Sequence, residues 1–228
     1  VWDITNNYAK IHNINHNYIG YICSNLLLFN INNKNYIITS SDNSCEDFTR
    51  IYNFDDGNFI QNMNHTNNNS TSHLIPWFNN NEYFIIELCY AKVIVNNLLK
   101  NLNYAVLTCK PEDYHVDGFI YLQKFLCCSS GNGFVRIWDL ATKNLYKSIE
   151  ITGAFLRGII NWNDNKFIVA DDTNNSLIII DIGKGRVIKK IKTPHIKDVN
   201  GIQKMNICDY GEIIISASWD KSIRLWTI

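Results

Sequence analysis

The sequence predicts an all-β fold built from one repeated module of four antiparallel strands. Three observations predict it: short β-rich runs recur along the 228 residues, turn residues separate them, and their matching positions fall at a nearly constant interval. The apolar runs are far shorter than the roughly eighteen residues that a membrane-spanning helix needs. We therefore expect residues 1–228 to form a single β domain without a transmembrane segment.

The repeat is clearest in two segments that carry a tryptophan near their end. Residues 134–140 (FVRIWDL) match residues 222–228 (SIRLWTI), and weaker copies occupy residues 1–4, 49–54, 92–97 and 177–182. The tryptophan or its replacement then stands at positions 2, 52, 95, 138, 180 and 226, spaced by 50, 43, 43, 42 and 46 residues. Self-similarity at this period indicates a repeat architecture.

Each of the last five markers follows a turn, and a second β-rich run precedes that turn. These second strands are expected at residues 36–40, 83–88, 124–129, 166–170 and 212–218. Further β-rich stretches flank the pairs, upstream at 116–122 and 199–205 and downstream at 145–149 and 186–191. Four strands in about 43 residues is typical of a propeller blade, a small sheet that packs face to face on its neighbours. The asparagine tracts 67–69 and 79–81 are interpreted as loops.

On these residues, the chain resembles the WD-repeat (WD40) β-propeller family over its whole length. The best copy is the last unit, where residues 213–226 (IIISASWDKSIRLW) follow a histidine. The resemblance implies a buried hydrogen-bonded relay of His195, Ser216, Asp220 and Trp226. In the unit that ends at Trp138, His115 is taken to match the histidine, while Asn132 replaces the aspartate.

The resemblance also implies where this chain lies in a longer propeller. It looks like the C-terminal five to five and a half blades of a seven-bladed parent, because it opens inside a third strand. Propellers of this family commonly close when an N-terminal strand completes the last blade, which removes exposed sheet edges. We therefore expect that these 228 residues alone do not close a ring.

Charge restricts the partners that the chain can recruit. Lysine and arginine total 21 and aspartate and glutamate total 21, so no global charge attracts nucleic acid or a membrane. One local segment is basic, and two interpretations of it stay open: an outer strand whose lysines oppose edge-to-edge aggregation, or a patch for phosphoinositide or RNA. It comprises Lys184, Arg186, Lys189, Lys190, Lys192 and Lys197.

Catalytic, metal and cofactor chemistry has little support in the sequence. The relay contains the residue types of a serine hydrolase triad, but no G-x-S-x-G elbow accompanies them, so we expect no enzyme. The histidine pairs His12/His16 and His65/His73 lack cysteine or carboxylate partners at ligand spacing, so we expect no metal or other cofactor. Seven cysteines without C-x-x-C spacing predict buried apolar thiols in a reducing compartment, the cytoplasm or the nucleus.

The predicted function is that of a non-catalytic WD-repeat scaffold, which binds protein partners through loops of the narrow propeller face. The residues assigned to partner binding are Trp219, Lys221 and Arg157. For Trp219, which stands directly before the turn aspartate, partner binding and local packing both stay open. The alternative function is binding of phosphate-bearing ligands through the basic segment from Lys184 to Lys197.

Overall fold

The computed structural model describes residues 2–3, 9–10, 23–41, 49–63, 71–109, 114–151, 153–207 and 211–227. Within these ranges the chain forms strands and turns, and no helix has the length and apolar character to cross a membrane. The chain divides into two compact units, residues 1–89 with 94–105 and residues 90–93 with 106–228. Each unit is described by itself.

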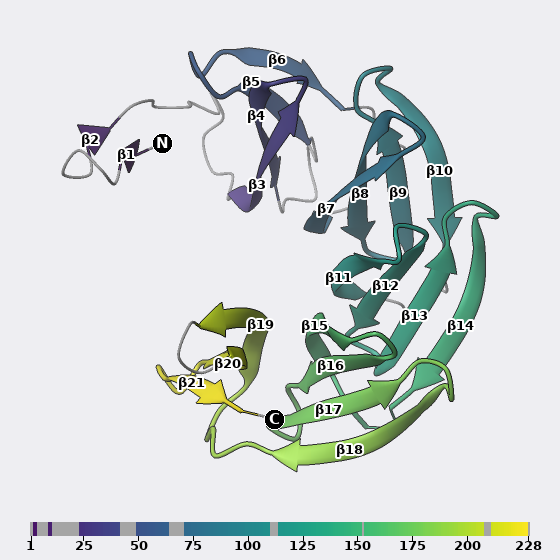
Figure 1. The fold of residues 1–228 in the computed structure, drawn as a ribbon, viewed down its shortest axis with the longest axis vertical. Helices are drawn as coiled ribbons and strands as arrows, with labels where there is room; N and C mark the ends of the chain where they lie inside the picture. Colours follow the sequence, from purple (N-terminus) through teal and green to yellow (C-terminus); the bar gives the residue numbers. More distant parts are fainter. Residues whose placement is uncertain are drawn as a thin grey trace. The chain divides into compact units, whose positions relative to one another are not determined.

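The first unit contains a short ladder and two four-stranded antiparallel sheets (Figure 1). The ladder pairs β1 (Trp2–Asp3) with β2 (Ala9–Lys10). The first sheet comprises β3 (Cys23–Ile31), β4 (Lys34–Ser41), β5 (Arg50–Asn53) and β6 (Phe59–Asn62). The second comprises β7 (Thr71–Asn79), β8 (Glu82–Cys89), β9 (Lys92–Asn97) and β10 (Leu102–Thr108), whose last two strands straddle the boundary between the units.

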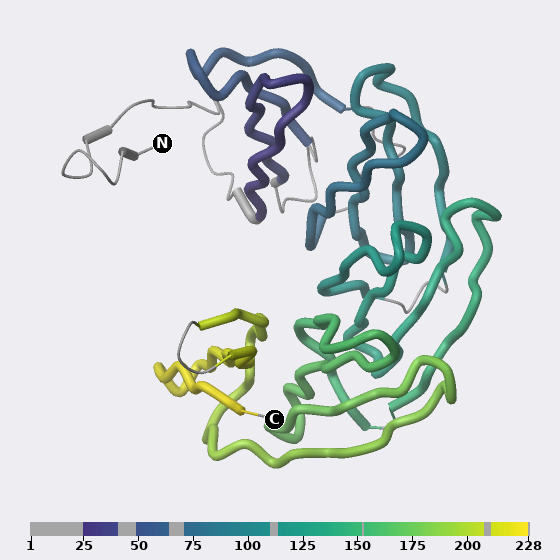
Figure 2. The backbone as a smooth tube through the Cα atoms, in the orientation of Figure 1, coloured from purple at the N-terminus to yellow at the C-terminus, as the bar shows by residue number. Residues whose placement is uncertain are grey.

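The second unit contains three successive sheets, in each of which the chain moves sideways by one strand at a time (Figure 2). The first comprises β11 (His115–Tyr121), β12 (Phe125–Ser130), β13 (Phe134–Asp139) and β14 (Asn144–Glu150). The next comprises β15 (Leu156–Asn163), β16 (Lys166–Asp171), β17 (Ser176–Asp181) and β18 (Arg186–Lys192). The last has three strands, β19 (Val199–Ile207), β20 (Gly211–Ser218) and β21 (Ile223–Trp226).

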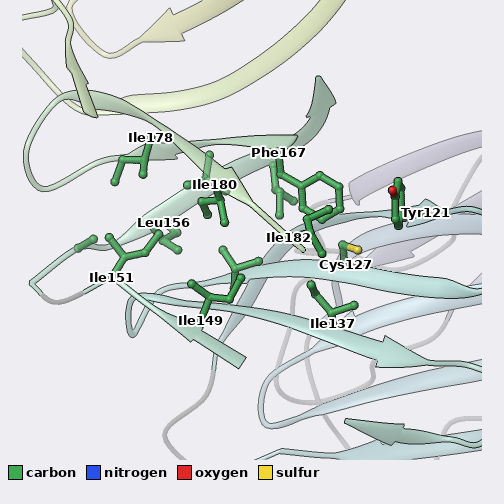
Figure 3. Close-up of a cluster of buried hydrophobic side chains, with 14 residues drawn as sticks. Tyr121, Cys127, Ile137, Ile149, Ile151, Leu156, Phe167, Ile178, Ile180 and Ile182 are labelled. Carbon is green, nitrogen blue, oxygen red and sulfur yellow. The ribbon is translucent and has the colours of Figure 1, made fainter. Parts of the chain in front are cut away.

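The middle strands of the blades are apolar on both faces. In β16, Phe167 and Val169 face one neighbouring sheet, while Ile168 and Ala170 face the other, and all four side chains are fully buried. Figure 3 shows the first of these layers, where side chains of two sheets, among them Ile137 and Ile180, point toward one another. A continuous apolar run in a short strand is what burial of both faces requires. The sheets therefore hold one another in place through interleaved aliphatic layers.

Two tight hairpins use asparagine where the backbone must be left-handed. Asn32 and Asn33 connect β3 to β4 with φ of 49° and 63°, and Asn80 and Asn81 connect β7 to β8 with φ of 48° and 60°. Positive φ at both central residues is the geometry of a type I′ turn, which asparagine tolerates better than most residues. In the tract at 79–81, Asn79 ends β7 and only Asn80 and Asn81 form the connection, while the tract at 67–69 lies outside the described residues.

The third strand of each of four blades ends in an asparagine or aspartate that caps the following turn. The side-chain oxygen of Asn53 accepts the N–H of Asp55, and that of Asn97 accepts the N–H of Lys100. In the second unit, Asp139 accepts from Ala141 and Thr142, and Asp181 accepts from Lys184. Such side-chain to backbone bonds are local turn chemistry.

A backbone bond beside these turns shows which residue of the second blade corresponds to the tryptophan of the repeat. Leu98 donates its N–H to the carbonyl of Tyr83 at 2.8 Å, as Leu140 donates to Lys124 at 3.0 Å. The residue two places before Leu140 is Trp138, so Asn96 corresponds to it. The marker at position 95, expected from spacing alone, was therefore wrong by one residue.

Candidate functional site in the last blade

The structure brings the four residues of the implied relay together in the last blade. His195 lies in the loop before β19, Ser216 in β20, Asp220 in the following turn and Trp226 in β21. Nδ1 of His195 is 2.8 Å from the Asp220 carboxylate, and Nε2 is 2.8 Å from Oγ of Ser216. The indole N–H of Trp226 donates to the same Oγ at 2.9 Å.

One direction of hydrogen bonding satisfies every member of this relay. Trp226 donates to Ser216, the Ser216 hydroxyl donates to Nε2 of His195, and Nδ1–H of His195 donates to Asp220. The side chain of His195 is fully buried and Ser216 is 0% exposed. The Ser216 hydroxyl is thus enclosed and already bonded on both sides, so the arrangement stabilises the blade instead of offering a nucleophile to a substrate.

The Asp220 carboxylate is held in its charged form. It accepts the hydroxyl and N–H of Ser222, the His195 ring and the N–H of Ile196. The Ser222 hydroxyl is the largest of the influences that lower the pKa of Asp220 far below its ordinary value. The pKa of Asp139 is lowered chiefly by the N–H of Thr142, and that of Asp181 chiefly by the N–H of Lys184.

These lowered pKa values predict acid sensitivity. A carboxylate whose folded pKa is depressed stabilises the fold above its unfolded pKa of about 3.9, and that contribution is lost as the pH falls toward the folded value. We expect the urea midpoint of unfolding to drop below about pH 4, with Asp220→Asn showing a smaller drop than the wild type. Urea titrations at a series of pH values measure this, with exposed Asp55→Asn as control. An unchanged drop in Asp220→Asn would contradict the assignment.

The relay holds the loop before β19 against the turn between β20 and β21. We call residues 195–198 of this loop and residues 218–222 around the turn the last-blade loop cluster. The N–H of Trp219 donates to the carbonyl of Asp198 at 3.1 Å, and the Ser218 hydroxyl donates to the carbonyl of Lys197 at 3.0 Å. Two apolar residues of this cluster are exposed at the surface: Trp219 is 63% exposed and Ile196 is 82% exposed. Lys221 completes the turn with a φ of 67° and is also exposed.

The other two blades of the second unit repeat the backbone bond, but the corresponding residue is buried or partly buried there. Gly131 donates to Tyr114, and Asp172 donates to Phe155, each at 2.8 Å, as Trp219 donates to Asp198. The Phe155 ring lies against Gly131, where an added Cβ would come within 2.6 Å of it.

Arg157, which was assigned to partner binding, lies in this same region. Its guanidinium binds the carboxylate of Asp172 at 2.7 Å and lies over the Phe155 ring, 5.0 Å from its centroid. It is therefore engaged inside its own blade, and partner contact by Arg157 stays a prediction. Ile196 was missed by the sequence reasoning, since a single isoleucine in a loop carries no periodic signal.

The relay is altered in the blade that ends at Trp138. Cys128 pairs with Arg136 as Ser216 pairs with Arg224, so a thiol takes the place of the serine, and it donates to the Arg136 carbonyl. His115 pairs with Ser130 inside β11, the register of Val199 and not of His195. The match of His115 to the repeat histidine was therefore wrong. Sequence order alone could not detect a shift of four residues along the chain.

A different polar cluster occupies the corresponding position in the first unit. Counting along β8 from the bond at Tyr83, Glu87 corresponds to Cys128 and hence to Ser216. Its carboxylate is 0% exposed and accepts from Asn96 at 2.6 Å, Thr49 at 2.7 Å and Thr71 at 3.4 Å. Asn96 therefore replaces the tryptophan and Glu87 the serine, which keeps the buried hydrogen bonding with other residue types. No sequence motif predicts that these residue types replace the tryptophan and the serine.

The basic segment does not form one patch. In β18, Lys189 pairs with Ile179 and Lys190 with Ile178, so the two lysines leave opposite faces of the sheet. Charges of this segment also have contacts within the chain: Lys184 lies 3.7 Å from the Asp181 carboxylate, and Lys192 donates to the carbonyl of Asn174 at 2.6 Å. Lys197 lies in the last-blade loop cluster, apart from the strand. Binding of phosphate through this segment stays a prediction without geometric support.

Metal ligands do not gather in the described part of the chain. No group of three or more histidine, cysteine, aspartate or glutamate side chains stands at ligand distance there. Of the histidine pairs considered, His73 lies in β7, while His12, His16 and His65 lie outside the described residues. Cys89, Cys127 and Cys128 are buried, as predicted, whereas Cys109 is partly exposed.

Comparisons with known proteins agree with this architecture. Residues 187–227 match the family model described as WD domain, G-beta repeat. The crystal structure of the WD40 beta propeller domain of Doa1 superimposes with a TM-score of 0.69 at 14% identity, covering 88% of this chain and 62% of that one. Autophagy-related protein 16 of Arabidopsis thaliana is 27% identical over 94 residues, 41% of this chain and 18% of that protein.

The fold is that of a WD40-type β-propeller, with antiparallel blades of up to four strands. The chain shares this fold, and its last blade carries the repeat that matches the WD domain, G-beta repeat model. It spans less than a fifth of the curated relative and about three fifths of the structural one.

Proposed function

We propose that this chain is a non-catalytic WD-repeat scaffold that binds protein partners through the last-blade loop cluster. The observation that carries the proposal is Trp219, whose indole is 63% exposed on a backbone that the relay holds in place. Aromatic side chains presented on a rigid frame are typical anchors of protein interfaces. The likeness to WD40 propellers and to Autophagy-related protein 16 supports this class of function.

The neighbours of Trp219 favour a mixed apolar and acidic partner surface. Ile196 extends the apolar area from the clamped loop, and Lys221 adds a positive charge beside it. An apolar centre with charges at its rim is the usual anatomy of a protein interface. The Asp220 carboxylate takes no part in contact, because its hydrogen bonds are directed into the blade.

Removing the indole tests the proposal. We expect Trp219→Ala to weaken partner binding by about tenfold or more, and Ile196→Ala by less, because a central aromatic anchor carries most of the binding energy. Affinity capture from cell extract with quantitative mass spectrometry identifies the proteins whose recovery depends on Trp219, and titration with the purified partner measures the loss. Tyr146→Ala, which removes another exposed aromatic ring from β14, is the matched control.

Salt separates this proposal from the phosphate alternative. Binding to an anionic ligand falls steeply between low and high salt, whereas an aromatic-anchored interface responds mainly to Trp219→Ala. Equal recovery of every partner by the wild type and Trp219→Ala, with loss in Lys189→Ala or Lys190→Ala, would overturn the proposal.

A further inference from the structure

Cys109 differs from the other cysteines whose side chains are described. Cys89, Cys127 and Cys128 are 0% exposed, and burial raises the pKa of Cys127 well above its ordinary value, which keeps that thiol protonated and inert. Cys109 is partly exposed and lies directly after β10, where its N–H donates to the carbonyl of Ala91 at 2.9 Å. The default role of a buried apolar thiol therefore does not fit Cys109.

The distinguishing contact is with His115. Sγ of Cys109 lies 2.9 Å from Nε2 of His115, whose side chain is buried in β11. The strand register fixes the position of His115 in the sheet, since it pairs with Ser130. A thiol within hydrogen-bond reach of an imidazole nitrogen can pass its proton to that nitrogen, and the thiolate is the reactive form.

A pocket gives access to the Cys109 side of this pair. It has a volume of about 380 Å³, and its lining residues all belong to the second unit: Thr108, Cys109, Phe134, Arg136, Trp138, Leu145 and Ser148. This volume is within the range of small-molecule sites, which combine an apolar lining with a few polar groups. The thiol thus stands in the wall of a pocket large enough for a small organic molecule.

We propose that Cys109 is a reactive thiol, activated by His115, that forms a mixed disulfide with low-molecular-weight disulfides. Nε2 of His115 accepts the thiol proton, and the Cys109 thiolate attacks one sulfur of the disulfide. A new S–S bond forms to Cys109 while the original S–S bond breaks, and the departing thiolate takes the proton from His115. The protein thiol is oxidised, one half of the reagent is reduced to a thiol, and the imidazole returns to its starting state.

Glutathione disulfide is the probe that tests this reaction. The full chain is incubated with it, the remaining thiols are blocked with iodoacetamide, and peptide mass spectrometry follows each cysteine separately. We expect Cys109 to form the mixed disulfide at least about tenfold faster than Cys127 or Cys128, and we expect His115→Gln to remove most of that advantage. Cys109→Ser is the control for the assignment of the adduct. Equal rates at Cys109 and Cys128, or an unchanged rate in folded His115→Gln, would overturn the proposal.

A second measurement does not depend on a variant that must fold. The rate at Cys109 is compared in the folded wild type and in the same chain unfolded by urea. Partial burial alone slows a thiol in the folded state, whereas activation by His115 makes the folded chain react faster. Slower reaction of Cys109 in the folded chain would therefore exclude activation. Neither outcome bears on partner binding, which is measured through Trp219.

Discussion

Glu87→Ala is expected to lower the free energy of unfolding by about 3 kcal/mol or more, because it strands several buried donors at once. The Glu87 carboxylate accepts from Asn96, Thr49 and Thr71 at a site that is 0% exposed. Deleting the side chain also leaves a cavity at the centre of the blade. Urea unfolding followed by far-ultraviolet circular dichroism measures the change.

Two further variants define what Glu87 contributes. Glu87→Gln keeps the shape and one acceptor oxygen, and rotating threonine hydroxyls can adapt to its amide, so we expect less than half of the alanine effect. Glu82→Ala removes a carboxylate from the same strand whose partner is Lys100 at the surface, and we expect a loss within about 1 kcal/mol. If Glu82→Ala and Glu87→Ala lower the free energy of unfolding equally, the buried cluster stabilises the chain no more than a surface ion pair does.

Ser216→Ala is expected to destabilise the last blade by about 2 kcal/mol, because it unpairs two buried groups with one small change. Oγ of Ser216 joins Nε2 of His195 to the indole N–H of Trp226, and alanine can serve neither. Trp226 packs against the apolar layer between the last two sheets, so its fluorescence reports the local loss. Exposed Ser148→Ala is the control. A midpoint for Ser216→Ala that equals the control would show that the relay is dispensable.

The two predictions also separate general from particular features of the fold. Ser216 belongs to the relay that the family resemblance implies, and the structure places its partners at hydrogen-bond distance. Glu87 belongs to a cluster that forms buried hydrogen bonds at the corresponding position with other residue types. If both variants destabilise the chain, then a satisfied buried polar centre is what a blade requires, and the identity of the residues is secondary.

Much of the fold could be predicted from local pattern. The second strands expected at 36–40, 83–88 and 166–170 are observed within one or two residues of those bounds. Alternation of side chains and turn chemistry depend on neighbours a few residues away, which a sequence displays directly. The length of the repeat also predicted how many strands a blade contains.

The candidate site was harder to predict, because its parts meet across longer distances. Spacing placed the marker of the second blade at Val95, but the backbone bond from Leu98 to Tyr83 places it at Asn96. His115 was matched to the repeat histidine, but its strand register is that of Val199, and its ring contacts the thiol of Cys109. A shift of one residue in a strand turns a side chain to the opposite face. Small errors of register therefore exchange one set of neighbours for another.

By itself the sequence determined the strands, their order and their grouping into repeated sheets, since these follow from apolar periodicity and turn residues within each repeat. The tertiary structure alone decided which buried polar groups meet, such as Glu87 with Thr49 and Cys109 with His115. It also decided that Trp219 stays exposed, while the Phe155 ring lies against the corresponding Gly131. The physical reason is that hydrogen bonds and burial depend on register and on packing between sheets, which no single repeat encodes.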